Sequence, residues 1–224
     1  MLPSSANVTG GIRNFGPFYN DVDGDCVCAA TEHVRMCKGV AQDSKLKHVL
    51  YRLGFKPPTG IYTFDLYAQY LATLSQKPGP ETGVNPAGWM AWLKSQNLIE
   101  DWGLILDYDQ AVLQQAMLDY RGYIQCVYLT DNAYHDVTPK LPWSVGPDTY
   151  DQPNYQLSHA IATVEYTPTL FTSVTWGYLK SATVGFIKEC WSGAVVFVTV
   201  EDQERLSLEA YDALLTKTAA LAKA

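Results

Sequence analysis

Two cysteines, Cys26 and Cys28, lie one residue apart where the loop sequence YNDVDGD meets an apolar run. Such a pair can be structural packing, half of a metal site, or a nucleophile at the start of a helix. Within one helix, side chains two positions apart point roughly 200° away from each other, which suits neither a shared metal nor a disulfide. The sequence has no second Cys-x-x-Cys or His-x-x-x-His to complete four zinc ligands. We therefore expect no metal and no cofactor.

Cys26 is the better candidate for chemistry. Gly24 or Asp25 can cap a helix that we predict over residues 26–38, because apolar residues recur there at helical spacing. A helix N-terminus places partial positive charge beside a sulfur and lowers the thiol pKa, and the thiolate is the nucleophilic form. We predict that Cys26 is a nucleophile in the first turn. The other cysteines are predicted to be buried packing residues: Cys28, Cys37, Cys126 and Cys190.

A cysteine nucleophile needs a general base from elsewhere in the chain. The sequence contains four histidines. His159 opens the apolar segment SHAIATVEY, and a strand of this kind would hold one ionisable side chain rigidly. We predict that His159 is the base. The remaining histidines are predicted to lie at the surface or at the edge of the core: His33, His48 and His135.

The pattern of apolar residues changes along the chain from helical spacing to alternation. The predicted helices cover 26–38, 44–53, a segment that starts with Thr63 as its cap, 86–93, the residues after an Asp109 cap up to Gly122, and about 207–222. The predicted strands are LILDY, YIQCVYLT, LSHAIATVEYT, LFTSVTW and AVVFVTV. We therefore expect an α+β protein. The chain would form a single domain, 1–224, with a mainly helical lobe at about 1–120 and a mainly β lobe with a C-terminal helix at about 121–224.

These motifs, in this order, resemble those of the papain-like cysteine peptidases. GDCVCAA is similar to the family's G-S-C-W-A-F, and SHAIATVEYT is similar to its histidine strand. The histidine lies about 130 residues after the cysteine, at the roughly 130–150-residue spacing of the family. VTWGYLKSATVGFI looks like the N-S-W-G…G-Y segment. The chain is also similar to uncharacterised papain-like proteins of bacteriophages and actinobacteria.

The resemblance implies a papain-like fold in which the helical lobe carries Cys26 and the antiparallel sheet lobe carries His159. Asn20, six residues before the cysteine, stands where the family has its oxyanion-hole glutamine. Thr175 follows Val174 at the place of the family's Asn-Ser, so a hydroxyl would have to orient the histidine. The resemblance also places Asp25 and Trp176 beside the substrate.

The implied activity is hydrolysis of peptide or related amide bonds. Cys26 would attack the carbonyl as a thiolate, and His159 would form an ion pair with it and then protonate the leaving amine. The loss of the orienting asparagine leaves an alternative, a weakly active or inactive papain-like structural protein of a phage particle. Its partners would then be other virion proteins.

The composition of the chain argues against two classes of partner, nucleic acids and membranes. The net charge is −7, the isoelectric point is about 5.0, and no run of Lys or Arg is present, which argues against nucleic acid. The first residues lack the basic and apolar regions of a signal peptide, and no apolar run approaches the length of a membrane span. We expect a cytoplasmic or virion-associated protein with no membrane span. The odd number of cysteines fits a reducing compartment.

Overall fold

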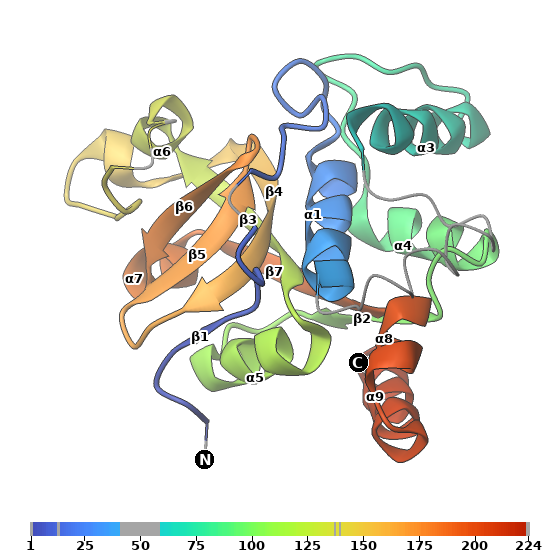
Figure 1. Cartoon of the computed structure of the whole chain (residues 1–224). Coiled ribbons are helices and arrows are strands. Elements are labelled where there is room, and N and C mark those ends of the chain that lie inside the picture. The colour runs from blue at the N-terminus through green and yellow to red at the C-terminus, as the bar shows by residue number, and fades with distance from the viewer. Residues whose placement is uncertain (1, 13, 41–58, 137, 139, 223–224) are drawn as a thin grey trace.

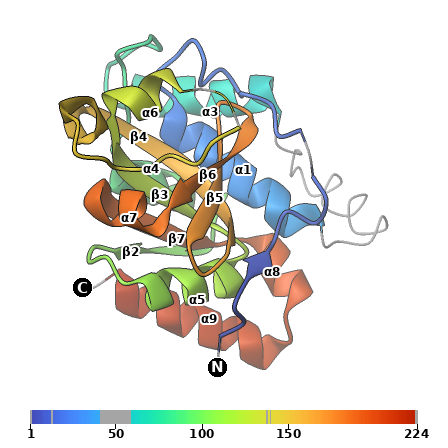
Figure 2. The ribbon, with the colours of Figure 1, turned by 90° about the vertical axis from the view of Figure 1, so that its left-hand side faces the viewer.

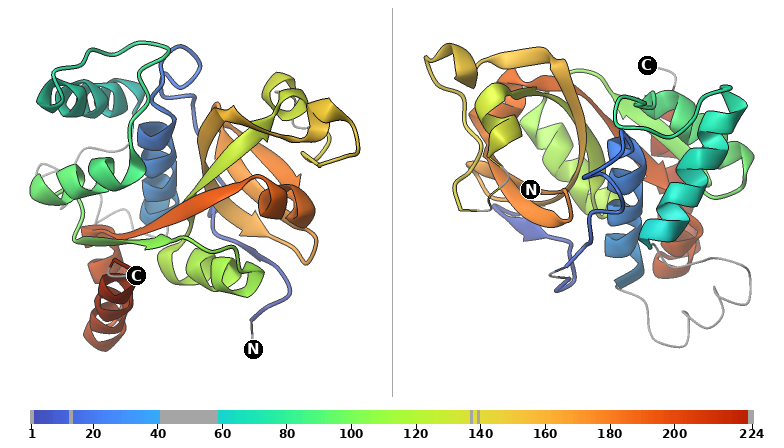
Figure 3. Two further views of the ribbon diagram at one scale, coloured as in Figure 1. Left: turned by 180° about the vertical axis from the view of Figure 1, so that it is seen from behind. Right: turned by 90° about the horizontal axis from the view of Figure 1, so that it is seen from above.

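The computed structural model describes residues 2–12, 14–40, 59–136, 138 and 140–222 of the 224-residue chain. In this part of the chain, helices pack around one antiparallel sheet of seven strands, so the protein is α+β as predicted. Helix α1 (Cys26–Val40) stands between the sheet on one side and α3 (Gly60–Thr73) and α4 (Pro86–Ser95) on the other (Figure 1). Seen from above, α1 separates the sheet from α3 (Figure 3).

The sheet has the strand order β2-β7-β3-β4-β5-β6, and the short β1 pairs with the C-terminal end of β4. The strands are β1 (Ala6–Asn7), β2 (Asp101–Ile105), β3 (Tyr123–Thr130), β4 (Pro153–Tyr166), β5 (Leu170–Thr175), β6 (Tyr178–Thr183) and β7 (Trp191–Val198). The last strand in the sequence, β7, thus lies between β2 and β3. In β3, Cys126 pairs with Ala160 of β4 on one side and with Gly193 of β7 on the other.

The remaining elements surround the sheet. They are α5 (Gln110–Tyr120), α6 (Asp131–His135), the 3₁₀ helix η1 (Thr149–Asp151), α7 (Val184–Glu189), α8 (Val200–Arg205) and α9 (Leu208–Leu221). In Figure 2, α5 and α9 lie together along one end of the molecule. Gly103 of β2 allows α9 to approach closely, because a Cβ at this position would lie 2.6 Å from Leu221 and 2.9 Å from the Thr218 carbonyl oxygen. Among the described helices, none is long and apolar enough to cross a membrane.

Most predicted elements are confirmed. Helices α1, α4, α5 and α9 occupy the predicted ranges, and Asp109 caps α5 by accepting hydrogen bonds from two first-turn N–H groups. The prediction for α3 is wrong by one turn. Thr59 is its cap and accepts from the Tyr62 N–H, while Thr63 is buried in the first turn and donates to the Thr59 carbonyl. The helix predicted over 44–53 lies outside the described residues.

Two element ends also differ from the prediction. The strand predicted over LILDY begins earlier, because residues 101–105 pair with β7, and it ends at Ile105. At the end of α5, Arg121 is the cap and takes a left-handed conformation with φ 55°, directly before Gly122 at φ 112°. Helix α5 thus ends beside the predicted glycine, but a non-glycine residue makes the first left-handed turn.

Buried ion pairs tie the C-terminal half of α1 to α8. Arg35 contacts Glu32 at 2.9 Å and Glu201 at 3.3 Å, and Lys38 contacts Asp202 at 2.6 Å. The side chains of Lys38 and Asp202 are fully buried. Because an unpaired charge in such a place costs several kcal/mol, these pairs specify how α1 meets α8. The N-terminal end of α1, which begins at Cys26, faces the sheet.

Candidate active site

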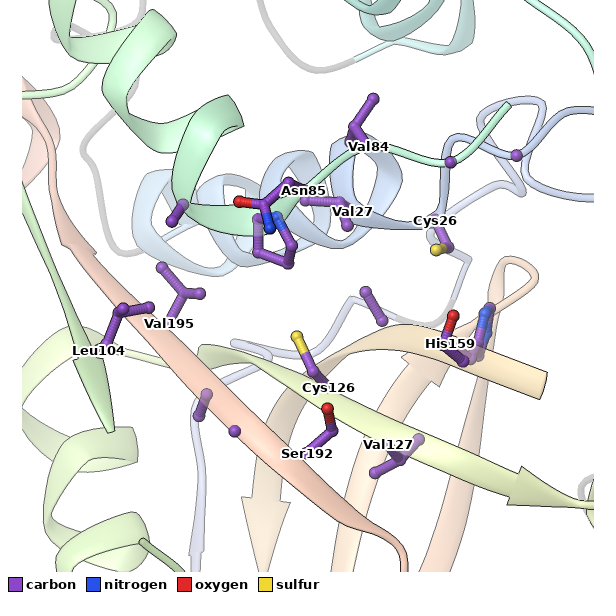
Figure 4. A pocket seen from close by; sticks show the side chains of 18 of the residues that line it. Cys26, Val27, Val84, Asn85, Leu104, Cys126, Val127, His159, Ser192 and Val195 are labelled. Carbon is purple, nitrogen blue, oxygen red and sulfur yellow. The ribbon is translucent and has the colours of Figure 1, made fainter. Parts of the chain in front are cut away.

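A cleft of about 680 Å³ separates the N-terminal end of α1 from the sheet (Figure 4). One wall is formed by the start of α1 and by the segment that leads into α4. The other wall is formed by residues of β3, β4 and β7 and by the end of β2. The side chains that line the cleft include Cys26, Val27, Glu81, Asn85, Leu104, Cys126, Gln156, Ser158, His159, Ser192 and Val195. The structure therefore brings the two predicted catalytic residues into one cleft.

Cys26 is the first residue of α1, as predicted. Gly24 fixes the loop before it, because its N–H donates to the Gly79 carbonyl at 3.0 Å and an added Cβ would lie 2.9 Å from the Thr82 carbonyl group. Burial raises the pKa of the Cys26 thiol, and the backbone N–H of Ala160 opposes this by pointing toward the sulfur. That N–H belongs to the residue after His159, so β4 meets the sulfur directly.

His159 lies on β4, across the cleft from Cys26 at the same end (Figure 4). Its Nε2 is 2.8 Å from the hydroxyl oxygen of Thr175, which is buried at the end of β5. When the threonine oxygen accepts a hydrogen bond from the Nε2–H group, Nδ1 carries no proton, and its lone pair is free to take one. The threonine hydroxyl thus occupies the orienting place predicted for it.

Trp176 covers the histidine. The indole and imidazole rings are stacked, with centroids 4.7 Å apart and planes inclined by 17°. The backbone of Trp176 is in the left-handed region with φ 46°, a conformation that costs on the order of 1 kcal/mol in a non-glycine residue. The next residue must be Gly177, because its φ is 88° and a Cβ would lie 2.6 Å from the backbone of Gly16 and Pro17. Trp176 therefore covers the base and does not line the cleft.

Burial acts against both charged forms of the predicted ion pair. Burial lowers the pKa of His159 to about 4, and burial raises the pKa of Cys26. Near pH 7 both directions favour a neutral thiol beside a neutral imidazole. The sequence-based prediction assumed that the helix N-terminus would decide the thiol pKa, but the enclosed site opposes both charged forms.

Asp25 and Asn20 are not exposed to the cleft. Asp25 is fully buried, and neither carboxylate oxygen has a hydrogen-bond partner among the described residues. Burial, followed by Asp23 and Asp21, raises the pKa of Asp25 to about 8. Asn20 is 9% exposed, its N–H donates to the Pro17 carbonyl at 3.0 Å, and it is not among the cleft residues. The structure thus does not bring Asp25, Asn20 or Trp176 into contact with the space a substrate would occupy.

Some of the other cysteines and histidines lie where the sequence predicts them, and some do not. Cys28, Cys37 and Cys190 are buried, as predicted. Cys126 is half-buried and lines the cleft, which corrects its prediction as a core residue. His33 is 1% exposed, lies 2.9 Å from the Gly16 carbonyl oxygen, and stacks on Phe18 at 4.7 Å, so it belongs to the core and not to its edge. His135 is exposed, and His48 lies outside the described residues.

Sequence reasoning missed the cleft residues that flank the dyad. Asn85 was interpreted only as the residue before a helix-opening proline, and Ser192 and Gln156 carried no signal in the sequence. Their strands and loops come together only in three dimensions. Among the described residues, no three His, Cys, Asp or Glu side chains lie close enough together to hold a metal ion. No protein-family model matches the chain, and no curated protein matches it either.

Proposed function

We propose that this chain is a papain-like cysteine hydrolase that cleaves peptide or related amide bonds. The observation that carries the proposal is the base across from the first residue of α1: His159 is held through Nε2 by Thr175, which leaves Nδ1 for the thiol of Cys26. The placement of the cysteine on a helix and the histidine on an antiparallel strand, with a cleft between them, also supports a papain-like arrangement of two lobes.

The reaction would begin when the substrate carbonyl enters the cleft. His159 takes the proton of the Cys26 thiol as the sulfur attacks the carbonyl carbon, and the carbonyl oxygen becomes an oxyanion. The Cys26 N–H at the N-terminus of α1 stabilises this charge, and one such donor is worth on the order of 3 kcal/mol. Asn20, the donor implied by the resemblance, is 9% exposed and is not among the cleft residues, so this step is written without it.

The second half of the reaction releases both products. The protonated His159 gives its proton to the leaving amine, the C–N bond breaks, and an acyl group remains on Cys26 as a thioester. A water molecule, deprotonated by the same imidazole, then attacks the thioester and frees the acid and the thiol. Trp176 keeps bulk water from one face of the imidazole throughout.

The test is hydrolysis of a broad panel of fluorogenic peptides and peptidoglycan fragments by the wild type and by Cys26→Ala. We expect turnover by the wild type and none by the variant. Cys126→Ala is the matched control, because it removes the second thiol of the same cleft and should retain most of the turnover. Turnover that persists unchanged in Cys26→Ala would overturn the mechanism.

A second candidate is a structural role in a phage particle, with virion proteins as partners. The enclosed thiol favours it, because burial raises the pKa of Cys26 and lowers its reactivity. Alkylation by iodoacetamide separates the candidates. In a hydrolase, a substrate-like peptide should slow alkylation of Cys26, whereas a purely structural thiol should show no protection and no turnover.

A further inference from the structure

Next to the dyad, the walls of the cleft present polar and apolar surface in similar amounts. Figure 4 shows Asn85 on the wall that leads into α4, with Cys126 and Ser192 on the opposite wall. Val27, Leu104 and Val195 provide apolar surface between them. The part of the cleft lined by Val27, Asn85, Leu104, Cys126, Ser192 and Val195, here called the basin, combines apolar surface with a few fixed polar atoms, which is the usual form of a site that selects a ligand.

The orientation of Asn85 is fixed by its own helix. Its Oδ1 accepts a hydrogen bond from the Gly88 N–H at 3.0 Å, as the cap of α4. The amide oxygen must face that donor, so the NH₂ group takes the other direction. In Figure 4 the amide nitrogen is turned into the cleft. Asn85 therefore presents hydrogen-bond donors at a set position.

The few charged groups in the cleft indicate whether a bound side chain is charged or neutral. Among the described lining residues, Glu81 is the one with a formal charge near pH 7, since His159 is neutral there, and Glu81 is exposed at the rim. A substrate carboxylate or ammonium group would lose its water in the basin without gaining an opposite charge. A neutral carboxamide, by contrast, can accept from Asn85 and exchange a hydrogen bond with the hydroxyl of Ser192.

The direction of the substrate follows from the mechanism. His159 must protonate the leaving amine, so the leaving group lies on the histidine side of Cys26. The acyl part then runs to the other side, where Figure 4 shows Asn85, Leu104 and Val195. The basin is thus available to a side chain on the acyl side of the bond that is cut.

We infer that Asn85 makes the proposed hydrolase selective for a glutamine-type side chain, a carboxamide on an aliphatic stem, on the acyl side of the scissile bond. This inference rests on the proposed function for the direction of the substrate. Asn85 is exposed in the empty cleft, so a bound side chain that covers its NH₂ group without accepting from it leaves this donor unpaired and is disfavoured. Glutamine should be preferred over methionine of similar length by about 10-fold or more.

The experiment measures kcat/KM for N-acylated dipeptide coumarylamides in which either acyl-side residue is glutamine, methionine, glutamate or lysine. Asn85→Asp and Asn85→Ser both keep an oxygen that can cap α4, but each removes the NH₂ donor. We expect both variants to lose the preference for glutamine over methionine, and Asn85→Asp to gain about 10-fold or more on lysine. Asp109→Asn, the reverse exchange at the cap of α5 and outside the cleft, should leave the profile unchanged.

A binding measurement tests the role of Asn85 separately from the proposed hydrolase activity. Fluorescein-labelled forms of the same peptides, without the coumarin, are titrated onto Cys26→Ala, with and without Asn85→Asp, by fluorescence anisotropy. Turnover that does not require Cys26, or no turnover at all, defeats the proposed function. Even then, a preference for glutamine in binding that Asn85→Asp abolishes supports the inferred role of Asn85 in selecting the side chain. Equal affinity for glutamine and methionine, an unchanged profile in Asn85→Asp, or no binding by any peptide overturns the inference.

Discussion

The two ends of α1 bury polar groups in opposite ways. At the C-terminal end, Lys38 meets Asp202 at 2.6 Å, and Arg35 meets two glutamates. At the N-terminal end, Asp25 is fully buried with no partner among the described residues, and Cys26 follows it directly. The first end pairs its charged groups with one another, whereas burial at the second end favours the neutral forms of Asp25 and Cys26.

This difference shows in the pKa values. Burial lowers the pKa of Lys38, and Asp202 opposes this effect without reversing it. The pKa of Asp202 is lowered, because Lys38 and Arg205 together outweigh burial. At the other end, burial dominates and raises the pKa of Asp25 to about 8. Removal of one partner from a buried pair leaves an uncompensated charge, whereas the unpaired Asp25 keeps its proton up to about pH 8. We therefore expect substitutions at the two ends to change different measurements.

The largest effect is expected at the catalytic end of the cleft. His159→Ala removes the base and should lower kcat/KM by about 10³-fold or more, while the unfolding free energy changes little. His135→Ala, an exposed histidine on α6, is the control and should leave kcat/KM unchanged. Steady-state kinetics and thermal unfolding measure the two quantities. A loss of activity below about 10-fold in His159→Ala would contradict its role as the base.

At the other end of α1, the expected change is in stability. Lys38→Met leaves Asp202 buried without its main partner and should lower the free energy of unfolding by about 3–5 kcal/mol. Lys94→Met breaks an exposed pair with Asp101 and should cost at most about 1 kcal/mol. Urea unfolding measures both. Equal costs for the two variants would contradict the contrast between the paired end and the protein surface.

Asp25→Asn tests the unpaired end directly. The unfolded chain releases the Asp25 proton near pH 4 and the folded chain near pH 8, so this group makes the folded state lose stability as pH rises through that window. The asparagine variant lacks this loss and should be more stable than the wild type at pH 8, by about 3–5 kcal/mol, with little difference at pH 4. Urea unfolding at both pH values gives the comparison. A wild type that is the more stable protein at pH 8 would show that Asp25 has a partner when ionised.

The smallest effect is expected at the residue that orients the base. Thr175→Val keeps the shape of the side chain but leaves Nε2–H of His159 without its acceptor. We expect kcat to fall by about 10- to 100-fold, since the wrong tautomer then competes, while KM changes little. Thr175→Ser restores the hydroxyl and should recover most of the rate. No difference between valine and serine would mean that stacking on Trp176 alone orients the ring.

Much of the dyad could be predicted because its signals are local. The helical spacing after Asp25 places Cys26 in a first turn, and the apolar segment around His159 indicates a strand that can hold an imidazole. Thr175 could be found only through the order of the motifs, since a threonine in a strand is unremarkable by itself. The structure places its hydroxyl at 2.8 Å from the ring.

The surroundings of the dyad could not be predicted, because they depend on contacts between distant segments. Nothing near Asp25 in the sequence indicates that the loop around Thr82 closes over this region. The alternation of β3 does not distinguish a side chain in the core from one in a cleft, so Cys126 was misplaced. Asn85 caps α4 directly before the helix-opening Pro86, but that its amide faces a cleft depends on where β7 lies.

The way Gly177 fits against Gly16 and Pro17 has a consequence for the synthesis of the protein. The cover of the base needs backbone from near both ends of the chain, and β7, which completes the wall of the cleft, is the last strand to leave the ribosome. A nascent chain therefore exposes the Cys26 thiol long before it can assemble the base and the cleft around it. The proposed activity would appear only after β7 has been synthesised.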